Sequence, residues 1–221
     1  MRSHGENRGT FLNNMRIAEH KLSIWKQVIY TVGILSLGII LGTASKYLDC
    51  TPSNELPYWI EKLDFRNFFG RFAIWIFLAV CISIYSKTSV RAAINVFFFF
   101  VGMVGSYYLY SKYIAGFFPY SYALIWIGFT AISPLLAFIC WYAKGSGKVP
   151  LIISAGIIAV LFNTTFAYGF GYFDVKSPLE LAVFVLAIII LRRTAKETII
   201  MISMGAVIAF ALNSIVPFQL W

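Results

Sequence analysis

The residues best suited to specific chemistry are two asparagines that end apolar segments. Asn163 closes SAGIIAVLFN (154–163), and Asn213 closes the similar MGAVIAFALN (204–213), at an offset of 50 residues. In a helix each asparagine continues a stripe of small residues, Gly156-Ala159-Asn163 and Ala206-Ala209-Asn213. Small residues let helices approach closely, and asparagine hydrogen-bonds between helices. We expect both asparagines to face protein, either as such interhelical bonds or as contacts to a ligand.

The similarity between these two segments has two interpretations. A duplicated two-helix unit would resemble the parallel repeats found in some transporters. The alternative is a chance likeness between two apolar helices, and the sequence alone leaves both open.

Tyrosines form a second group of candidates. They concentrate in SYYLYSKYIAGFFPYSY (106–122) and in FNTTFAYGFGYFDVKSP (162–178). A tyrosine offers a flat apolar face and a hydroxyl, which suits a pocket for a small, partly polar ligand. The alternative is an aromatic belt at the membrane interface. The complete set of candidate ligand-binding residues is Asn163, Asn213, Tyr168, Tyr172, Tyr107, Tyr110, Arg71 and Asp174.

The charged candidates each have a plainer interpretation. Arg71 follows Gly70 and either reaches an anion or anchors a helix at the interface. Asp174 is either a solvated loop acid or a cation ligand. Ser177-Pro178-Leu179-Glu180 matches a capping box with proline in the first helical turn, which assigns Glu180 to helix capping.

Several classes of catalytic or metal site have no support in the sequence. His4 and His20 are the only histidines, and the three cysteines form no C-x-x-C pair. Walker and G-x-G-x-x-G loops are absent as well. We therefore expect no enzyme activity, no catalytic residues, no metal site and no cofactor.

The elements that carry these residues are membrane-spanning helices. The chain is 60% hydrophobic and 12% charged, with a mean hydropathy of +0.78, whereas soluble domains carry about 25% charged residues. A span needs about 20 mostly apolar residues. The sequence predicts an all-α, polytopic bundle with seven spans in one domain (27–221), at about 27–45, 68–85, 91–112, 122–142, 150–168, 178–193 and 198–215. Span six has a short apolar core and is expected to continue through Arg192 and Arg193 by snorkelling.

The charge distribution predicts the orientation. With the N-terminus in the cytoplasm, twelve Lys and Arg residues lie inside and six outside, which favours N-in and C-out by the positive-inside rule. Residues 1–26 are then expected to form a disordered basic cytoplasmic tail. The basic residues are spread over short loops, so we expect no nucleic-acid partner. Ten of the thirteen tyrosines fall on the outer side, more than a symmetric aromatic belt predicts.

Three further local patterns concern packing and the outer loop. Gly38-x-x-x-Gly42 and Gly102-x-x-x-Ser106 predict faces where helices approach closely. In the first outer loop, apolar and charged residues lie side by side from Tyr58 to Arg66, which predicts a short helix lying on the membrane surface. Asp49 is expected to pair with Lys46 at a helix end.

Two segments of the chain carry a likeness to known proteins: GIILGTASKYLD (38–49) and FGRFAIWIFLAVCISIYSKTSVRAAINVFFFFVGMVGSYYLYS (69–111). With them the chain resembles, over roughly residues 28–216, a family of small bacterial multi-pass membrane proteins of unknown function. It implies a bacterial inner membrane and no catalytic residues. A looser likeness is to the substrate-capturing membrane subunits of vitamin-uptake transporters, which usually have six spans and an outer binding pocket.

Two hypotheses follow for function. The first is that the aromatic outer half binds a small solute, or helps to translocate it, with the lipid bilayer and a small-molecule ligand as partners. The second is a non-transporting scaffold or accessory subunit, whose small-residue faces pack against a partner membrane protein or a second copy of the chain.

Overall fold

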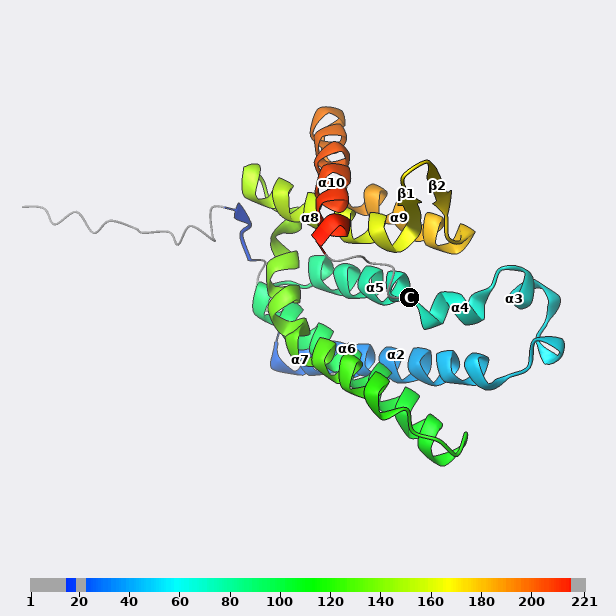
Figure 1. Cartoon of the computed structure of the whole chain (residues 1–221). Coiled ribbons are helices and arrows are strands. Elements are labelled where there is room, and N and C mark those ends of the chain that lie inside the picture. Colours follow the sequence, from blue (N-terminus) through cyan, green and yellow to red (C-terminus); the bar gives the residue numbers. More distant parts are fainter. Residues whose placement is uncertain (1–14, 19–22, 216–221) are drawn as a thin grey trace, which may run out of the picture.

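The computed structural model describes residues 15–18 and 23–215. Apart from one hairpin, the described part of the chain is helical, as expected (Figure 1). Residues 1–14 and 19–22, and with them most of the predicted N-terminal tail, lie outside the described residues. The helices are α2 (Ile24–Cys50), α3 (Tyr58–Lys62), α4 (Phe65–Gly70), α5 (Phe72–Tyr85), α6 (Ser89–Tyr113), α7 (Tyr120–Trp141), α8 (Lys148–Thr165), α9 (Pro178–Leu191) and α10 (Ala195–Ile215).

Among the described residues, five helices are long and apolar enough to cross a membrane. They are α2, α6, α7 with the 3₁₀ turn Tyr142–Lys144 that follows it, α8 and α10. Helices α5 and α9 are also apolar, but each has 14 residues, or about 21 Å at 1.5 Å per residue. A hydrocarbon core is about 30 Å thick. A multi-pass membrane protein is therefore supported by five long helices, with two shorter ones packed among them.

The predicted second span is broken near its start. Arg71 has an extended backbone (φ −99°, ψ 164°) and separates α4 from α5, so Phe68 belongs to α4 and not to α5. The predicted short helix in the outer loop is present as α3, with Tyr58 and Trp59 exposed. In Figure 1 α3 and α4 project beyond the start of α5.

Two predicted helix ends are wrong. The fifth helix stops at Thr165 rather than Tyr168, because β1 (Phe166–Gly169) pairs antiparallel with β2 (Tyr172–Val175). Gly171 turns the hairpin with a φ of +84°, a conformation that glycine adopts without steric cost. The sixth helix ends at Leu191, since Arg192 leaves the helix at ψ 140°. Its arginines do not extend the span.

Helices α2 and α6 pack through the two small-residue motifs. A Cβ on Gly38 would overlap the carbonyl oxygen of Phe99, and one on Gly42 would overlap that of Met103. From the other side, a Cβ on Gly102 would lie 2.5 Å from the carbonyl oxygen of Leu35. The hydroxyl of Ser106 donates to the carbonyl of Ile39 at 3.0 Å. The two motifs therefore face each other and bring the helix backbones into contact.

The two segments with similar sequences, in α8 and α10, also pack against each other. Gly205 lies against Ile158 and the carbonyl oxygen of Ala155, and in Figure 1 α10 crosses α8. Of the six residues in the two expected stripes, only Ala159, Asn163 and Ala209 are buried. Ala155, Ala159 and Asn163 are buried on α8, and Met201, Gly205 and Ala209 on α10, whereas Gly156, Ala206 and Asn213 are only half-buried.

Helix α5 lies between two hydrophobic clusters. Its Val80 and Ile84 belong to a cluster with residues of α8, α9 and α10. Its Trp75 belongs to a second cluster formed largely by α6 and α7. The short apolar helix is therefore buried between two groups of helices.

Arginines bind backbone carbonyls at the end of the bundle where α5 and α7 terminate. Arg16 donates to the carbonyls of Ile84 and Trp141 at 2.9 and 2.5 Å, and Arg193 donates to that of Ala143 at 2.6 Å. A cation beside a helix C-terminus is favourable, because the carbonyls there lack intrahelical partners. The hairpin, α3 and α4 lie at the opposite end (Figure 1).

Candidate functional site

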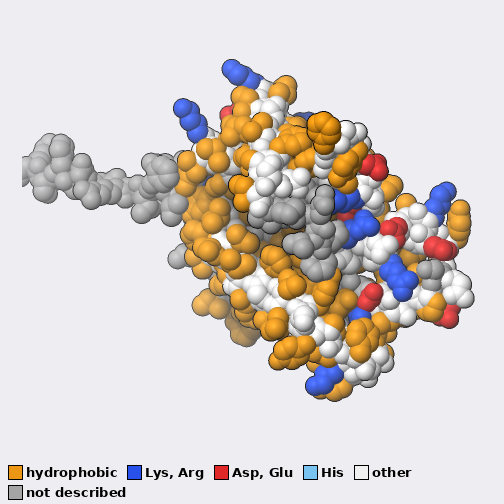
Figure 2. Space-filling model, in the orientation of Figure 1, with side chains coloured by type: hydrophobic (Ala, Val, Ile, Leu, Met, Phe, Trp, Pro, Cys, Tyr) orange, Lys and Arg blue, Asp and Glu red, His pale blue; other side chains and the backbone are white. Residues whose placement is uncertain are grey.

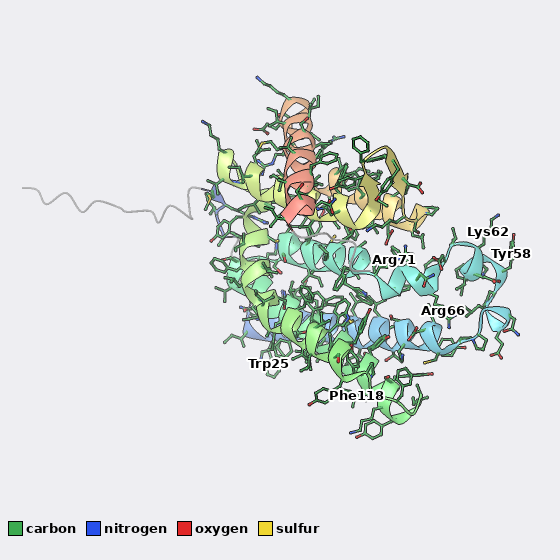
Figure 3. The ribbon with its side chains drawn as sticks, in the orientation of Figure 1. Trp25, Tyr58, Lys62, Arg66, Arg71 and Phe118 are labelled. Atoms are coloured by element: carbon green, nitrogen blue, oxygen red, sulfur yellow. The ribbon has the colours of Figure 1, made fainter. Side chains whose placement is uncertain are left out.

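The most unusual side chain of the described residues is Glu180, in the first turn of α9. It has no exposed surface, and it is the only charged residue of an otherwise apolar helix. Its Oε2 lies 3.3 Å from Nη1 of Arg71, which stands at the α4–α5 junction (Figure 3). A charged residue held inside an apolar helical bundle is costly, and such residues commonly mark functional sites.

The second oxygen of Glu180 has no hydrogen-bond partner among the described residues. The predicted capping box is therefore only half present. The hydroxyl of Ser177 accepts from the N–H of Leu179 at 3.3 Å, but the Glu180 carboxylate turns away toward Arg71. A buried polar atom without a partner typically costs about 1–3 kcal/mol. Helix capping consequently does not explain why a carboxylate stands here.

Arg71 lies between two carboxylates. Besides its contact with Glu180, its Nη2 is 3.9 Å from Oδ2 of Asp64. The exposed fractions of the three side chains are 0% for Glu180, 28% for Arg71 and 46% for Asp64. Asp64 precedes α4 with a positive φ of 55°. The arginine thus connects a buried acid to an acid in contact with solvent. Figure 2 shows the acidic and basic side chains gathered around α3, α4 and the start of α5.

Lys176 interacts electrostatically with Arg71 and Glu180 and binds the C-terminal end of α8. Its Nζ donates to the carbonyl oxygen of Asn163 at 3.0 Å, and its N–H donates to that of Thr165 at 2.9 Å. Burial lowers the pKa of Lys176, Glu180 acts in the opposite direction, and Arg71 lowers it further. We call Asp64, Arg71, Lys176 and Glu180 the Glu180 cluster.

Asn163 and Tyr168 form a neighbouring set of hydrogen bonds. The Tyr168 hydroxyl lies 2.5 Å from Oδ1 of Asn163 and 3.1 Å from the carbonyl oxygen of Ala209. The amide of Asn163 donates to the same Ala209 carbonyl at 3.2 Å. Burial raises the pKa of Tyr168. The interhelical hydrogen bond expected of Asn163 is therefore present and joins α8 to α10.

The remaining candidates near the hairpin lie apart from this set. Tyr172 and Asp174 are on β2, where Tyr172 is half exposed and Asp174 accepts from the N–H of Val175. Asn213 is half-buried on α10, one turn beyond Ala209, and within the described residues its side chain makes no hydrogen bond. The structure thus brings Asn163 together with Tyr168, but not with Tyr172, Asp174 or Asn213.

A second polar group lies at the C-terminal end of α2. Lys46 is almost fully buried, its Nζ is 2.5 Å from Oδ2 of Asp49, and it faces the rings of Tyr107 and Phe117 at 4.9 and 4.5 Å. The Tyr107 hydroxyl donates to the same Asp49 oxygen at 3.2 Å. The expected Lys46–Asp49 pair is confirmed.

Tyr107 also borders an aromatic crevice. The crevice has a volume of about 50 Å³ and lies where α2, α4, α5, α6 and α7 meet. Tyr110 is half exposed and does not line it. We call this cavity the aromatic crevice. Its lining residues are Ser45, Phe69, Gly70, Trp75, Met103, Val104, Tyr107, Tyr108, Tyr122 and Trp126.

Sequence reasoning missed the burial of Glu180 and Lys46 and the partial burial of Lys176. Glu180 matched a capping pattern that accounted for it locally, and Lys46 was expected only to pair with Asp49 at a helix end. The usable signal for Glu180 was a lone carboxylate opening an apolar helix.

Comparisons with known proteins supply no template for either site. The chain matches no described protein family, no curated protein and no solved structure. Among the described residues no three His, Cys, Asp or Glu side chains are grouped so that they could hold a metal ion.

Proposed function

We propose that this protein is a multi-pass protein of the bacterial inner membrane that binds a small solute from the outer side or helps to translocate it. The observation that carries the proposal is the aromatic crevice, where Trp75, Tyr107, Tyr108 and Trp126 converge from three helices. Concave sites lined by aromatic side chains and a few polar groups are the usual form of small-ligand sites.

The lining of the crevice defines the class of solute. Tyrosine hydroxyls and Ser45 supply the polar contacts, and the aromatic rings supply flat apolar surface. No carboxylate, lysine or arginine lines the crevice. The solute is therefore small, uncharged over most of its surface and partly polar. The crevice provides no pair of nucleophile and base, so the proposal includes no enzyme activity.

Opening of the crevice is part of the proposal. Its volume of about 50 Å³ is well below the 300–1,000 Å³ typical of ligand pockets. Phe69 and Gly70 belong to α4, which is separated from α5 by the extended Arg71. Movement of this short helix at Arg71 would widen the crevice without unfolding a long helix.

The proposed topology places the crevice on the outer side. In it α4 and α5 together form the second crossing, α9 forms a short sixth crossing, and the chain runs N-in and C-out. The carbonyl-binding Arg16 and Arg193 then lie on the cytoplasmic side, as the positive-inside rule favours. A C-terminal alkaline phosphatase fusion should be active. Activity of a cytoplasmic reporter at that position instead would contradict seven crossings.

Thermal unfolding of the purified protein with a panel of metabolites tests solute binding, because a ligand that binds only the native state raises apparent stability. Tyr107→Phe should weaken the affinity of a stabilising metabolite about tenfold, the effect of one lost hydrogen bond of about 1.4 kcal/mol. Tyr110→Phe is the matched control and should leave it unchanged. Absence of any stabilising metabolite would contradict the proposal, and equal effects of the two variants would exclude the crevice.

A further inference from the structure

The Glu180 cluster has a feature that solute binding in the aromatic crevice does not use. One carboxylate oxygen of Glu180 is buried without a partner in the described part of the chain, while the other is 3.3 Å from Arg71. An ionised carboxylate needs several donors to offset its loss of hydration. A single contact with Arg71 leaves the Glu180 carboxylate with too few hydrogen-bond donors. A further species is therefore needed to satisfy its second oxygen.

The surroundings of Glu180 restrict what that species can be. The charged groups facing it are Arg71 from the α4–α5 junction, Lys176 from the segment before α9, and Asp64 before α4. Two of these are cations, and in the described ranges no cluster of acidic side chains supplies the oxygen ligands that a metal cation requires. A proton needs no coordination shell and converts the buried charge to a neutral acid.

Arg71 has an alternative partner when Glu180 is neutral. Asp64 is already 3.9 Å from Nη2 of Arg71, and it is exposed to solvent where Glu180 is not. A small movement of the guanidinium therefore exchanges one ion pair for the other. Because Asp64 and Arg71 bracket α4, the exchange acts on the helix that contributes Phe69 and Gly70 to the crevice.

We propose that Glu180 binds a proton from the outer side, and that this proton transfers Arg71 from Glu180 to Asp64 and so moves α4. The step adds one proton to the unpartnered oxygen of Glu180 and breaks the Arg71–Glu180 ion pair, so that Arg71 pairs with Asp64 alone. No other bond changes. This inference rests on the proposed function, because the movement of α4 matters only if a solute binds in the aromatic crevice. Protons would then control access to the crevice.

Infrared spectroscopy of the full-length protein in lipid vesicles tests the proton site directly. A protonated carboxylic acid has a C=O stretch separate from that of a carboxylate, and lowering the pH should produce this band from a buried acid. Glu180→Gln should abolish it. Glu61→Gln, which removes an exposed acid on α3, is the matched control and should retain it.

A second variant tests the role of the arginine. Arg71→Gln removes the cation, and a carboxylate that loses such a partner protonates at a higher pH. The midpoint of the band should move up accordingly. If Arg71→Gln does not fold, the comparison of wild type with Glu180→Gln still decides the proposal.

The outcomes separate the two proposals. A wild-type spectrum with no band lost in Glu180→Gln overturns the proton site, whether or not a metabolite stabilises the protein. A Glu180 band without any stabilising metabolite leaves the proton site in place and removes the solute proposal. If a metabolite is found, its affinity should depend on pH in wild type and not in Glu180→Gln. Equal pH dependence in the two proteins overturns the link between proton and crevice.

Discussion

Replacing a glycine in the α2–α6 contact should destabilise the protein by an amount that the structure sets. In Gly102→Ala the new Cβ would lie 2.5 Å from the carbonyl oxygen of Leu35 and 3.1 Å from the backbone nitrogen of Ile39. Ordinary contact begins at 3.4 Å, so the helices must separate by about 0.9 Å, a gap that forfeits a quarter to a half of each dispersion contact it opens.

The expected loss follows from that separation. Overpacking of this kind typically costs about 1–3 kcal/mol. The atoms that must move are backbone atoms, which cannot rotate away as a side chain can. The separation also stretches the bond from Ser106 to the Ile39 carbonyl, now 3.0 Å. We therefore expect Gly102→Ala to lose stability at the upper end of that range.

Gly105→Ala is the matched control on the same helix. No atom lies within 4 Å of its added Cβ, and replacing glycine by alanine inside a helix typically gains about 0.5–1 kcal/mol. Unfolding in mixed micelles, followed by the loss of helical circular dichroism, measures both variants. If Gly102→Ala and Gly105→Ala are equally stable, the close contact between α2 and α6 described above is incorrect.

Three further predictions concern the hairpin and its base. Asn163→Leu should lower the free energy of unfolding by about 1–3 kcal/mol, because it leaves the Tyr168 hydroxyl and the Ala209 carbonyl with one partner fewer. Asn213→Leu, the control, should change that free energy by less than about 0.5 kcal/mol. Equal losses in the two variants would refute the hydrogen bonds assigned to Asn163. Tyr168→Phe should cost about 1 kcal/mol in the same assay, and no loss would mean that its hydroxyl is not bonded in the folded protein. Burial lowers the pKa of Lys176, so the unfolded chain holds the lysine proton more tightly than the folded protein does. The free energy of unfolding should therefore rise with pH toward 10.5. The slope of stability against pH should be smaller in Lys176→Met than in wild type, and an identical slope in both proteins would contradict this prediction.

The membrane character of the chain could be predicted because composition and apolar length depend on local sequence alone. Five of the predicted spans coincide with long apolar helices. Helix ends were less predictable. Helix α8 ends at Thr165 because the hairpin begins there, and α9 ends at Leu191 because the backbone of Arg192 leaves the helix. Four-residue strands are too short for their alternation to stand out among six aromatic residues.

Contacts between distant segments could not be predicted for a different reason. Gly38, Gly42 and Gly102 each identify a face that packs closely, but their spacing does not say which faces meet. The same limit applies to Glu180 and Arg71, which are 109 residues apart. The capping pattern around Glu180 is a local signal, and only the arrangement of α4, α5 and α9 reveals the partner on the other side.

The position of α5 between the two hydrophobic clusters has a mechanical consequence. Trp75 faces one group of helices, and Val80 and Ile84 face the other. If one group of helices rotates relative to the other, α5 lies at the axis of the rotation, and the contacts on its two sides shift by different amounts. Distances between labels placed on α6 and on α9 would report such a rotation as a change of opposite sign at the two ends of the bundle, while labels within α2 and α6 would stay at a constant separation.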